Sequence, residues 1–126
     1  MGSVLTEIVI ASTDPARAAE FWSAALGWEL RWYMPGNVPW MSASGDPEKH
    51  DLKLVFVAVG EGQRPSDRLY VNPSGCELSE EVERLRDLGA VPGNTTGTGA
   101  TERDTPWVAL VDPGGTGLTV LPTRVD

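Results

Sequence analysis

The chain has 126 residues and a mass of 13.5 kDa, a length that predicts one domain with a core of its own. Its 18 acidic and 10 basic side chains give a net charge of −8, which argues against nucleic-acid and membrane-surface partners because phosphate groups would be repelled. One histidine (His50) and one cysteine (Cys76) are too few for a zinc site built from nitrogen and sulfur ligands. A lone cysteine, with no signal peptide and no long apolar run, predicts a cytoplasmic protein.

The first half of the chain predicts one helix among four strands. The helix begins at Asp14-Pro15, because Asp is a favoured N-cap and Pro a favoured first helical residue, and it ends at Gly27. Apolar residues at three- and four-residue steps give this helix one buried face. The predicted helix covers residues 16–26, and the predicted strands cover 4–11, 28–34, 39–44 and 52–59.

After the glycines at 60 and 62 the same order begins again. Strand 68–72 is followed by helix 78–88, and strands 107–111 and 118–121 flank an Asp-Pro-Gly-Gly turn. Segment 93–106 is either a long loop or a hairpin whose strands cannot be placed from the sequence.

The two halves of the sequence indicate an internal duplication. Gly27 and Gly89, which end the two predicted helices, lie 62 positions apart, about half the chain. The sequence therefore predicts an α+β fold of two βαβββ modules, about 1–60 and 66–126. We expect the modules to form a curved sheet cup, with the helices on the convex face and the concave face open to a ligand.

Several short motifs resemble one known superfamily. They are Thr13-Asp14-Pro15, Phe21-Trp22, Leu26-Gly27-Trp28 and the closing Asp112-Pro113-Gly114-Gly115. The chain resembles the glyoxalase/bleomycin-resistance/extradiol-dioxygenase (vicinal oxygen chelate) superfamily, and the likeness spans nearly its whole length. It implies paired βαβββ modules and, in the enzymes of the superfamily, a divalent metal held by His and Glu on the concave face.

The metal-ligand positions of the superfamily are mostly lost in this sequence. Carried over by counting, they fall on Glu7, Tyr70, Thr119 and either Val55 or Val57. Only Glu7 is a good ligand, and oxygen-only sites usually take several carboxylates and carbonyls. We therefore expect no metal and no cofactor.

The same face supplies the candidate ligand-binding residues. Glu7 would act as a general base or cation anchor, unless it is a solvated edge residue. Large aromatic rings can stack a planar ligand, and polar tips can hydrogen-bond it, although ordinary core and sheet packing explains the same residues. These candidates are Trp32, Trp40 and Trp107 for stacking, and Tyr70, Asn72 and Thr119 for hydrogen bonding.

Two classes of function remain open. The first is a metal-independent protein that binds a planar or apolar small molecule in the cup. The second is a metal-independent isomerase, lyase or cyclase in which Glu7 is the general base and Tyr70 assists. A divalent-metal glyoxalase or dioxygenase would need further ligands. We also expect a homodimer, because members of the superfamily commonly pair and open sheet edges need protection.

Overall fold

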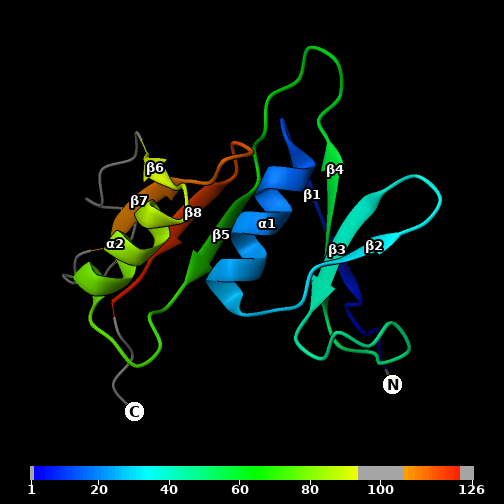
Figure 1. Cartoon of the computed structure of the whole chain (residues 1–126), viewed down its shortest axis with the longest axis horizontal. Coiled ribbons are helices and arrows are strands. Elements are labelled where there is room, and N and C mark those ends of the chain that lie inside the picture. Colours follow the sequence, from blue (N-terminus) through cyan, green and yellow to red (C-terminus); the bar gives the residue numbers. More distant parts are fainter. Residues whose placement is uncertain (1, 94–106, 123–126) are drawn as a thin grey trace.

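The chain folds into two βαβββ modules, which confirms the predicted α+β architecture (Figure 1). The computed structural model describes residues 2–93 and 107–122. The first module holds β1 (Glu7–Ser12), α1 (Pro15–Leu26), β2 (Arg31–Tyr33), β3 (Val38–Ser42) and β4 (Lys53–Ala58). The second holds β5 (Arg68–Val71), α2 (Leu78–Asp87), β6 (Val91–Pro92), β7 (Val108–Val111) and β8 (Gly117–Val120).

Most element boundaries agree with the sequence prediction to within one or two residues, and three differences are larger. The predicted strand 28–34 shortens to β2, and the predicted strand 4–11 begins only at Glu7. The two-residue strand β6 was not predicted, because Val91–Pro92 is too short for a readable alternation. Most of the segment 93–106 lies outside the described residues.

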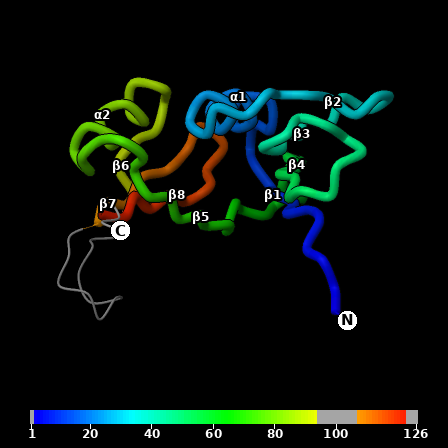
Figure 2. Tube along the Cα trace, turned by 90° about the horizontal axis from the view of Figure 1, so that it is seen from below, coloured from blue at the N-terminus to red at the C-terminus, as the bar shows by residue number. Residues whose placement is uncertain are grey.

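Each module forms its own mixed four-stranded sheet. The strand orders are β1-β4-β3-β2 and β5-β8-β7-β6, with β1 parallel to β4 and β5 parallel to β8. Both helices lie on the same side of the sheets (Figure 2). The two sheets are separate hydrogen-bonded units, one in each of the two predicted modules. Each sheet has one face packed on helices and one face without them.

Helix α1 forms as its end signals predict. The Asp14 carboxylate accepts a hydrogen bond from the Arg17 backbone N–H at 3.2 Å, and Pro15 is the first helical residue. Gly27 ends the helix in the left-handed region, at φ 73°, where glycine has no steric cost. The apolar face of α1 buries Phe21 and Trp22 in the core between the helices and the sheets.

A buried contact joins the two modules. The Trp22 indole Nε1 donates to the Asp112 carboxylate at 2.6 Å, across 90 residues of sequence. The other oxygen of Asp112 accepts the backbone N–H groups of Gly114 and Thr116, both at 2.8 Å, and so shapes the β7–β8 turn. The Gly114 carbonyl accepts the Thr13 N–H at 2.9 Å, which docks the turn on the start of α1.

The two modules also meet where β1 ends and β5 begins. The Asp67 carboxylate accepts the Ala11 backbone N–H at 3.0 Å. From this contact β1 and β5 run apart, so no ladder joins the sheets (Figure 1). No helix in the described part of the chain is long and apolar enough to cross a membrane.

We expect Trp22→Phe to destabilise the protein by about 1–3 kcal/mol, because the buried Asp112 carboxylate loses a donor. The measurement is the free energy of unfolding from urea titration. Trp28→Phe is the matched control, since it also removes an indole, one that donates no hydrogen bond to the described residues. Equal losses in the two variants would show that the Trp22–Asp112 hydrogen bond contributes nothing beyond packing.

Candidate functional site

The face of the first sheet that lies away from the helices, here called the open face, gathers chemically distinct side chains from its four strands. Residues paired across neighbouring strands point to the same side of a sheet. Glu7 pairs with Lys53, and Trp40 pairs with Val55, two residues further along β4. Arg31 pairs with Trp40, and Tyr33 lies two residues after Arg31, so Tyr33 and Trp40 point to the same side of the sheet. The residues that alternate with these along each strand point to the other side, toward the helices.

An aromatic pair and a lysine form the centre of this open face. The rings of Tyr33 and Trp40 stack with centroids 5.4 Å apart and planes 19° apart. The Lys53 ammonium lies 5.9 Å from the centroid of the Trp40 ring, within cation–π range, and donates to the Lys49 carbonyl at 3.1 Å. Trp40 is 3% exposed and Lys53 8% exposed, so both are held in fixed positions.

Glu7 and Tyr33 interact across the same face. Glu7 is exposed, and no hydrogen bond or ion pair joins its carboxylate to another residue within 2–93 and 107–122. Burial raises the pKa of the Tyr33 phenol, and the negative charge of Glu7 raises that pKa further. The phenol whose charge state depends on Glu7 is therefore Tyr33, whereas the sequence analysis paired Glu7 with Tyr70.

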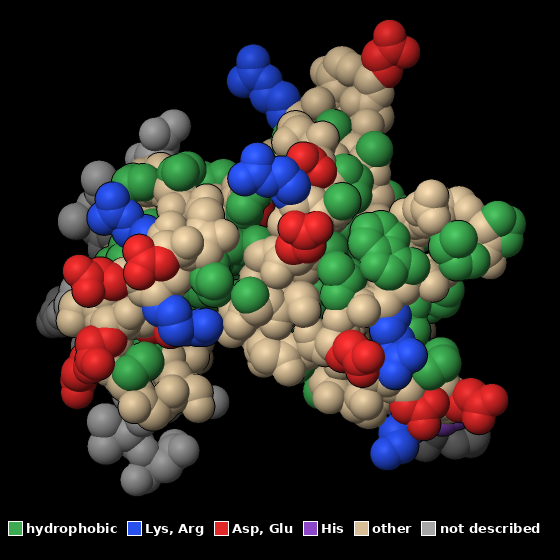
Figure 3. Space-filling view, in the orientation of Figure 1, with side chains coloured by type: hydrophobic (Ala, Val, Ile, Leu, Met, Phe, Trp, Pro, Cys, Tyr) green, Lys and Arg blue, Asp and Glu red, His purple; other side chains and the backbone are tan. Residues whose placement is uncertain are grey.

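An open cleft lies at the outer edge of the first sheet, beside the aromatic pair. Its volume is about 500 Å³. Its lining residues are Glu29, Leu30, Arg31, Trp32, Tyr33, Trp40 and Pro47. Hydrophobic side chains gather over the β2–β3 hairpin, where Met34 is 71% exposed (Figure 3). An ion pair of Arg31 with Glu29, at 3.3 Å, borders the cleft.

Three of the residues predicted for the ligand face of the first module share the open face with Glu7. They are Trp40, Val55 and Val57. Trp32 is different, since it pairs with Pro39 and so points to the opposite side of β2 from Tyr33. The sequence did not reveal this because β2 has only three residues, and a strand that short shows no clear alternation.

The second sheet carries the remaining predicted residues. Tyr70 pairs with Thr119, and both point away from the helices; Tyr70 is exposed and Thr119 buried. The Asn72 amide donates to the Pro122 carbonyl at 3.0 Å, so it is already held locally. Trp107 lies directly before β7, and its buried indole N–H has no hydrogen-bond partner among the described residues.

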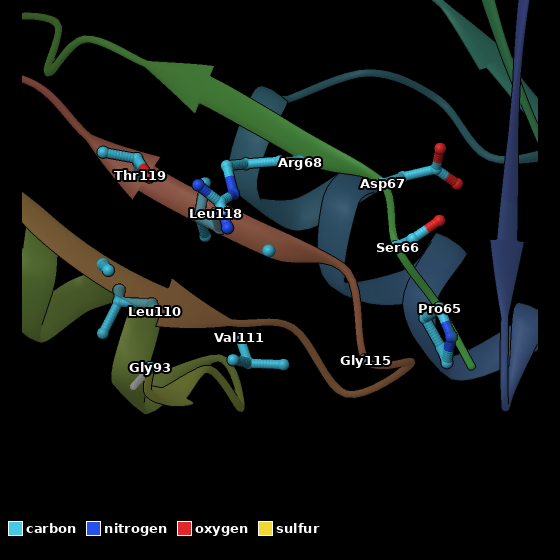
Figure 4. Close-up of a pocket in the computed structure, with 12 residues that line it drawn as sticks. Pro65, Ser66, Asp67, Arg68, Gly93, Leu110, Val111, Gly115, Leu118 and Thr119 are labelled. Carbon is cyan, nitrogen blue, oxygen red and sulfur yellow. The ribbon is translucent and has the colours of Figure 1, made fainter. Parts of the chain in front are cut away.

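A smaller hollow of about 240 Å³ lies on this second sheet (Figure 4). Its lining residues include Ser66, Asp67 and Arg68, at or just before the start of β5, and Thr119 of β8 (Figure 4). Gly93, Gly115 and Gly117 leave part of its wall as bare backbone. Thr119 is the predicted site residue that lines it.

The structure thus divides the predicted site between two sheets. Glu7 lies on β1 and Tyr70 on β5, and these strands run apart from the Ala11–Asp67 contact (Figure 1). Sequence counting could not show this divergence, because it depends on how the two modules dock.

Two residues of the open face were undervalued by the sequence analysis. Neither Lys53 nor Tyr33 was among the predicted site residues, although alternation along the strand 52–59 puts Lys53 on the same face as Val55. The signal for Tyr33 was its position in a run of aromatic residues, Trp32-Tyr33, opposite Trp40. In the part of the chain that the structure describes, no group of three or more His, Cys, Asp or Glu residues is placed to hold a metal ion.

Residues 7–121 match the model of the glyoxalase-like domain. No curated protein is significantly similar to the sequence. Among solved structures, TnmS3, an antibiotic-binding protein from a Streptomyces species, is 21% identical with a TM-score of 0.60; the match covers 97% of this chain and 98% of that one. The oxidase ChaP-H1 is also 21% identical, with a TM-score of 0.60 and 98% of both chains covered.

A third solved structure, the fosfomycin resistance protein FosX from Listeria monocytogenes in complex with Mn(II), is 13% identical. Its TM-score is 0.68, and the match covers 99% of this chain and 94% of FosX. At these identities the three structures show a shared fold, while the activities in their names differ.

The Tyr33–Glu7 interaction predicts a titration that can be measured directly. The chain has two tyrosines, so Tyr70→Phe leaves Tyr33 as the reporter in ultraviolet titration. We expect the pKa of Tyr33 to lie above that of a free phenol. Adding Glu7→Gln should lower this pKa, because the neutral amide no longer opposes the phenolate. An unchanged pKa would place Glu7 too far from Tyr33 to affect its titration.

Proposed function

Because the chain belongs to the glyoxalase-like domain family, we propose that it binds a planar small molecule on the open face of its first sheet, without a metal. The observation that carries this proposal is the stacked Tyr33–Trp40 pair beside a cleft of about 500 Å³. Ligand sites are concave and largely apolar, with a few polar groups that fix orientation. Val55 and Val57 extend the apolar area toward β1.

The position of the aromatic rings decides how a ligand would stack. Trp40 is buried and already covered by Tyr33, so a ligand would meet the exposed part of Tyr33 first. Trp32, 42% exposed, would contact the ligand from the edge of β2. Tyr70, Asn72, Thr119 and Trp107 would serve the same ligand only if it reached the open face of the second sheet.

Metal independence is part of this proposal. The ligand positions that the family would use hold Glu7, Tyr70, Thr119 and either Val55 or Val57. One carboxylate, one phenol and one hydroxyl, divided between two sheets, are a poor set for a hard cation, which prefers several carboxylates in one cage. The name of TnmS3, an antibiotic-binding protein, supports a binding role for a protein of this fold.

A catalytic function is the second candidate. The observation that favours it is Glu7, a carboxylate on the open face that has no ion-pair partner among the described residues and lies within electrostatic reach of the Tyr33 phenol. A carboxylate can remove a proton from a bound substrate, and a phenol can supply one. An isomerase, lyase or cyclase of this kind would need no metal. Tyr70 would take part only in a substrate long enough to reach the second sheet.

The binding proposal predicts that a planar cation binds in buffer containing EDTA. With 2-naphthylmethylammonium as the probe, Glu7→Gln should weaken binding by about 0.2–1 kcal/mol, the range for an ion pair with an exposed carboxylate. Ligand-observed NMR gives the dissociation constants. Glu61→Gln, which removes an equal charge from an exposed turn, is the matched control.

Each outcome separates the two candidate functions. Binding that requires added Mn²⁺ or Mg²⁺ would contradict metal independence. If a substrate is identified, a catalytic Glu7 requires that Glu7→Gln abolish turnover and largely preserve binding. A Glu7→Gln protein that binds and turns over like the wild type would exclude both roles of this carboxylate.

We also propose that the chain forms a homodimer. Apolar side chains near β1 and on β5 are left exposed in one copy, among them Val4, Leu5, Val9 and Tyr70. Exposed apolar side chains and unpaired sheet edges both favour association.

Light scattering at micromolar concentration should therefore give about twice the 13.5 kDa chain mass. Val9→Glu should shift the mass toward the monomer, because it places a charge in the apolar area. Val59→Glu, at a half-buried position beyond β4, controls for added charge. A wild-type mass near 13.5 kDa would contradict the dimer.

A further inference from the structure

The chemistry of the open face is decided by Lys53 as much as by Glu7. A lysine ammonium carries three donors, and it is costly to bury unless those donors are satisfied. Lys53 is 92% buried, as its exposed fraction is 8%. Among the described residues, one donor is used by the Lys49 carbonyl, and the Trp40 ring supplies a cation–π contact.

Neither neighbouring carboxylate forms an ion pair with this ammonium in the described part of the chain, although the backbone hydrogen bond from Ser44 and, beside it, the charge of Lys53 lower the pKa of Asp51. Glu7, its cross-strand partner on β1, forms no ion pair with it. Asp51 accepts hydrogen bonds from Ser44, from its backbone N–H at 2.9 Å and its hydroxyl at 3.1 Å. Lys53 is therefore a positioned cation with capacity for another acceptor.

A second donor on this face, from a side chain that also contacts Trp40, points to the same ligand chemistry. The Tyr33 hydroxyl is a donor on the same face, and the stacked pair holds its ring. The surrounding side chains of Val55 and Trp40 are apolar and buried. An oxygen acceptor on a flat ring would thus meet donors at the oxygen and apolar surface around the ring.

We propose that Lys53 binds an anionic oxygen of the ligand, so that the natural ligand is a planar aromatic molecule bearing a carboxylate or an ionised phenol. This inference rests on the proposed function and assigns the ligand class of the same site. Glu7 then accepts a hydrogen bond from a donor on the ligand, and Lys53 donates one to the anionic oxygen of the ligand. Charge-assisted hydrogen bonds to an ammonium are stronger than neutral ones and strengthen further in a partly buried site.

The experiment compares 2-naphthoate with 2-naphthamide, two planar probes that differ in charge. We expect wild-type protein to bind the carboxylate more tightly than the amide. Lys53→Met keeps the aliphatic stem and removes the charge, and it should weaken 2-naphthoate by about tenfold, the loss expected for one charged hydrogen bond. The affinity for 2-naphthamide should change less than about twofold, which excludes a general distortion of the face.

Two further variants sharpen the comparison. Lys53→Arg keeps the charge and should retain the preference for the carboxylate. Lys49→Met removes an exposed positive charge from the neighbouring loop and should leave both affinities unchanged, since its backbone carbonyl is preserved.

The possible failures are distinguishable. If neither probe nor 2-naphthylmethylammonium binds the wild type, the proposed function fails, and this inference fails with it. If the amide binds the wild type as tightly as the carboxylate, or if Lys53→Met weakens both probes equally, the role of Lys53 is wrong and the proposed binding function stands.

Discussion

The arrangement of the two modules depends on the buried hydrogen bond between Trp22 and Asp112. A carboxylate at 3% exposure is stable only when donors surround it, and Asp112 has one from α1 and two from its own turn. The donors of the turn fix its shape, and the indole fixes its position against the first module. Gly114 fits there because a Cβ would lie 1.8 Å from the Ser12 hydroxyl oxygen. Helix α1 and the β7–β8 turn therefore cannot move independently.

This docking decides which surfaces are available for binding. Both helices cover the same side of the sheets, so the other faces stay open (Figure 2). Acidic side chains are spread over both modules in this view (Figure 3). The net charge of −8 is thus a property of the whole surface and does not describe the open face, where Glu7 and Lys53 carry opposite charges.

The open face of the first sheet combines features that sequence reasoning had assigned to both modules. Its phenol is Tyr33, and its buried cation is Lys53. A face with a carboxylate at one edge and an ammonium near its centre favours a ligand with polar groups at separate positions on a flat body. Both candidate functions use the same groups. In catalysis Glu7 would remove a proton from the substrate, whereas in binding it would only accept a hydrogen bond from the ligand.

The sequence by itself determined the local elements and the duplication. Asp14-Pro15 and Gly27 define α1 because capping depends on neighbouring residues, and the alternation along β4 assigned Lys53 and Val55 to one face for the same local reason. Only the tertiary structure decided that Glu7 and Tyr70 lie on diverging strands and that Tyr33 stacks on Trp40. These are contacts between distant segments, set by how helices and turns pack, and no periodicity in the sequence encodes the angle at which two modules meet.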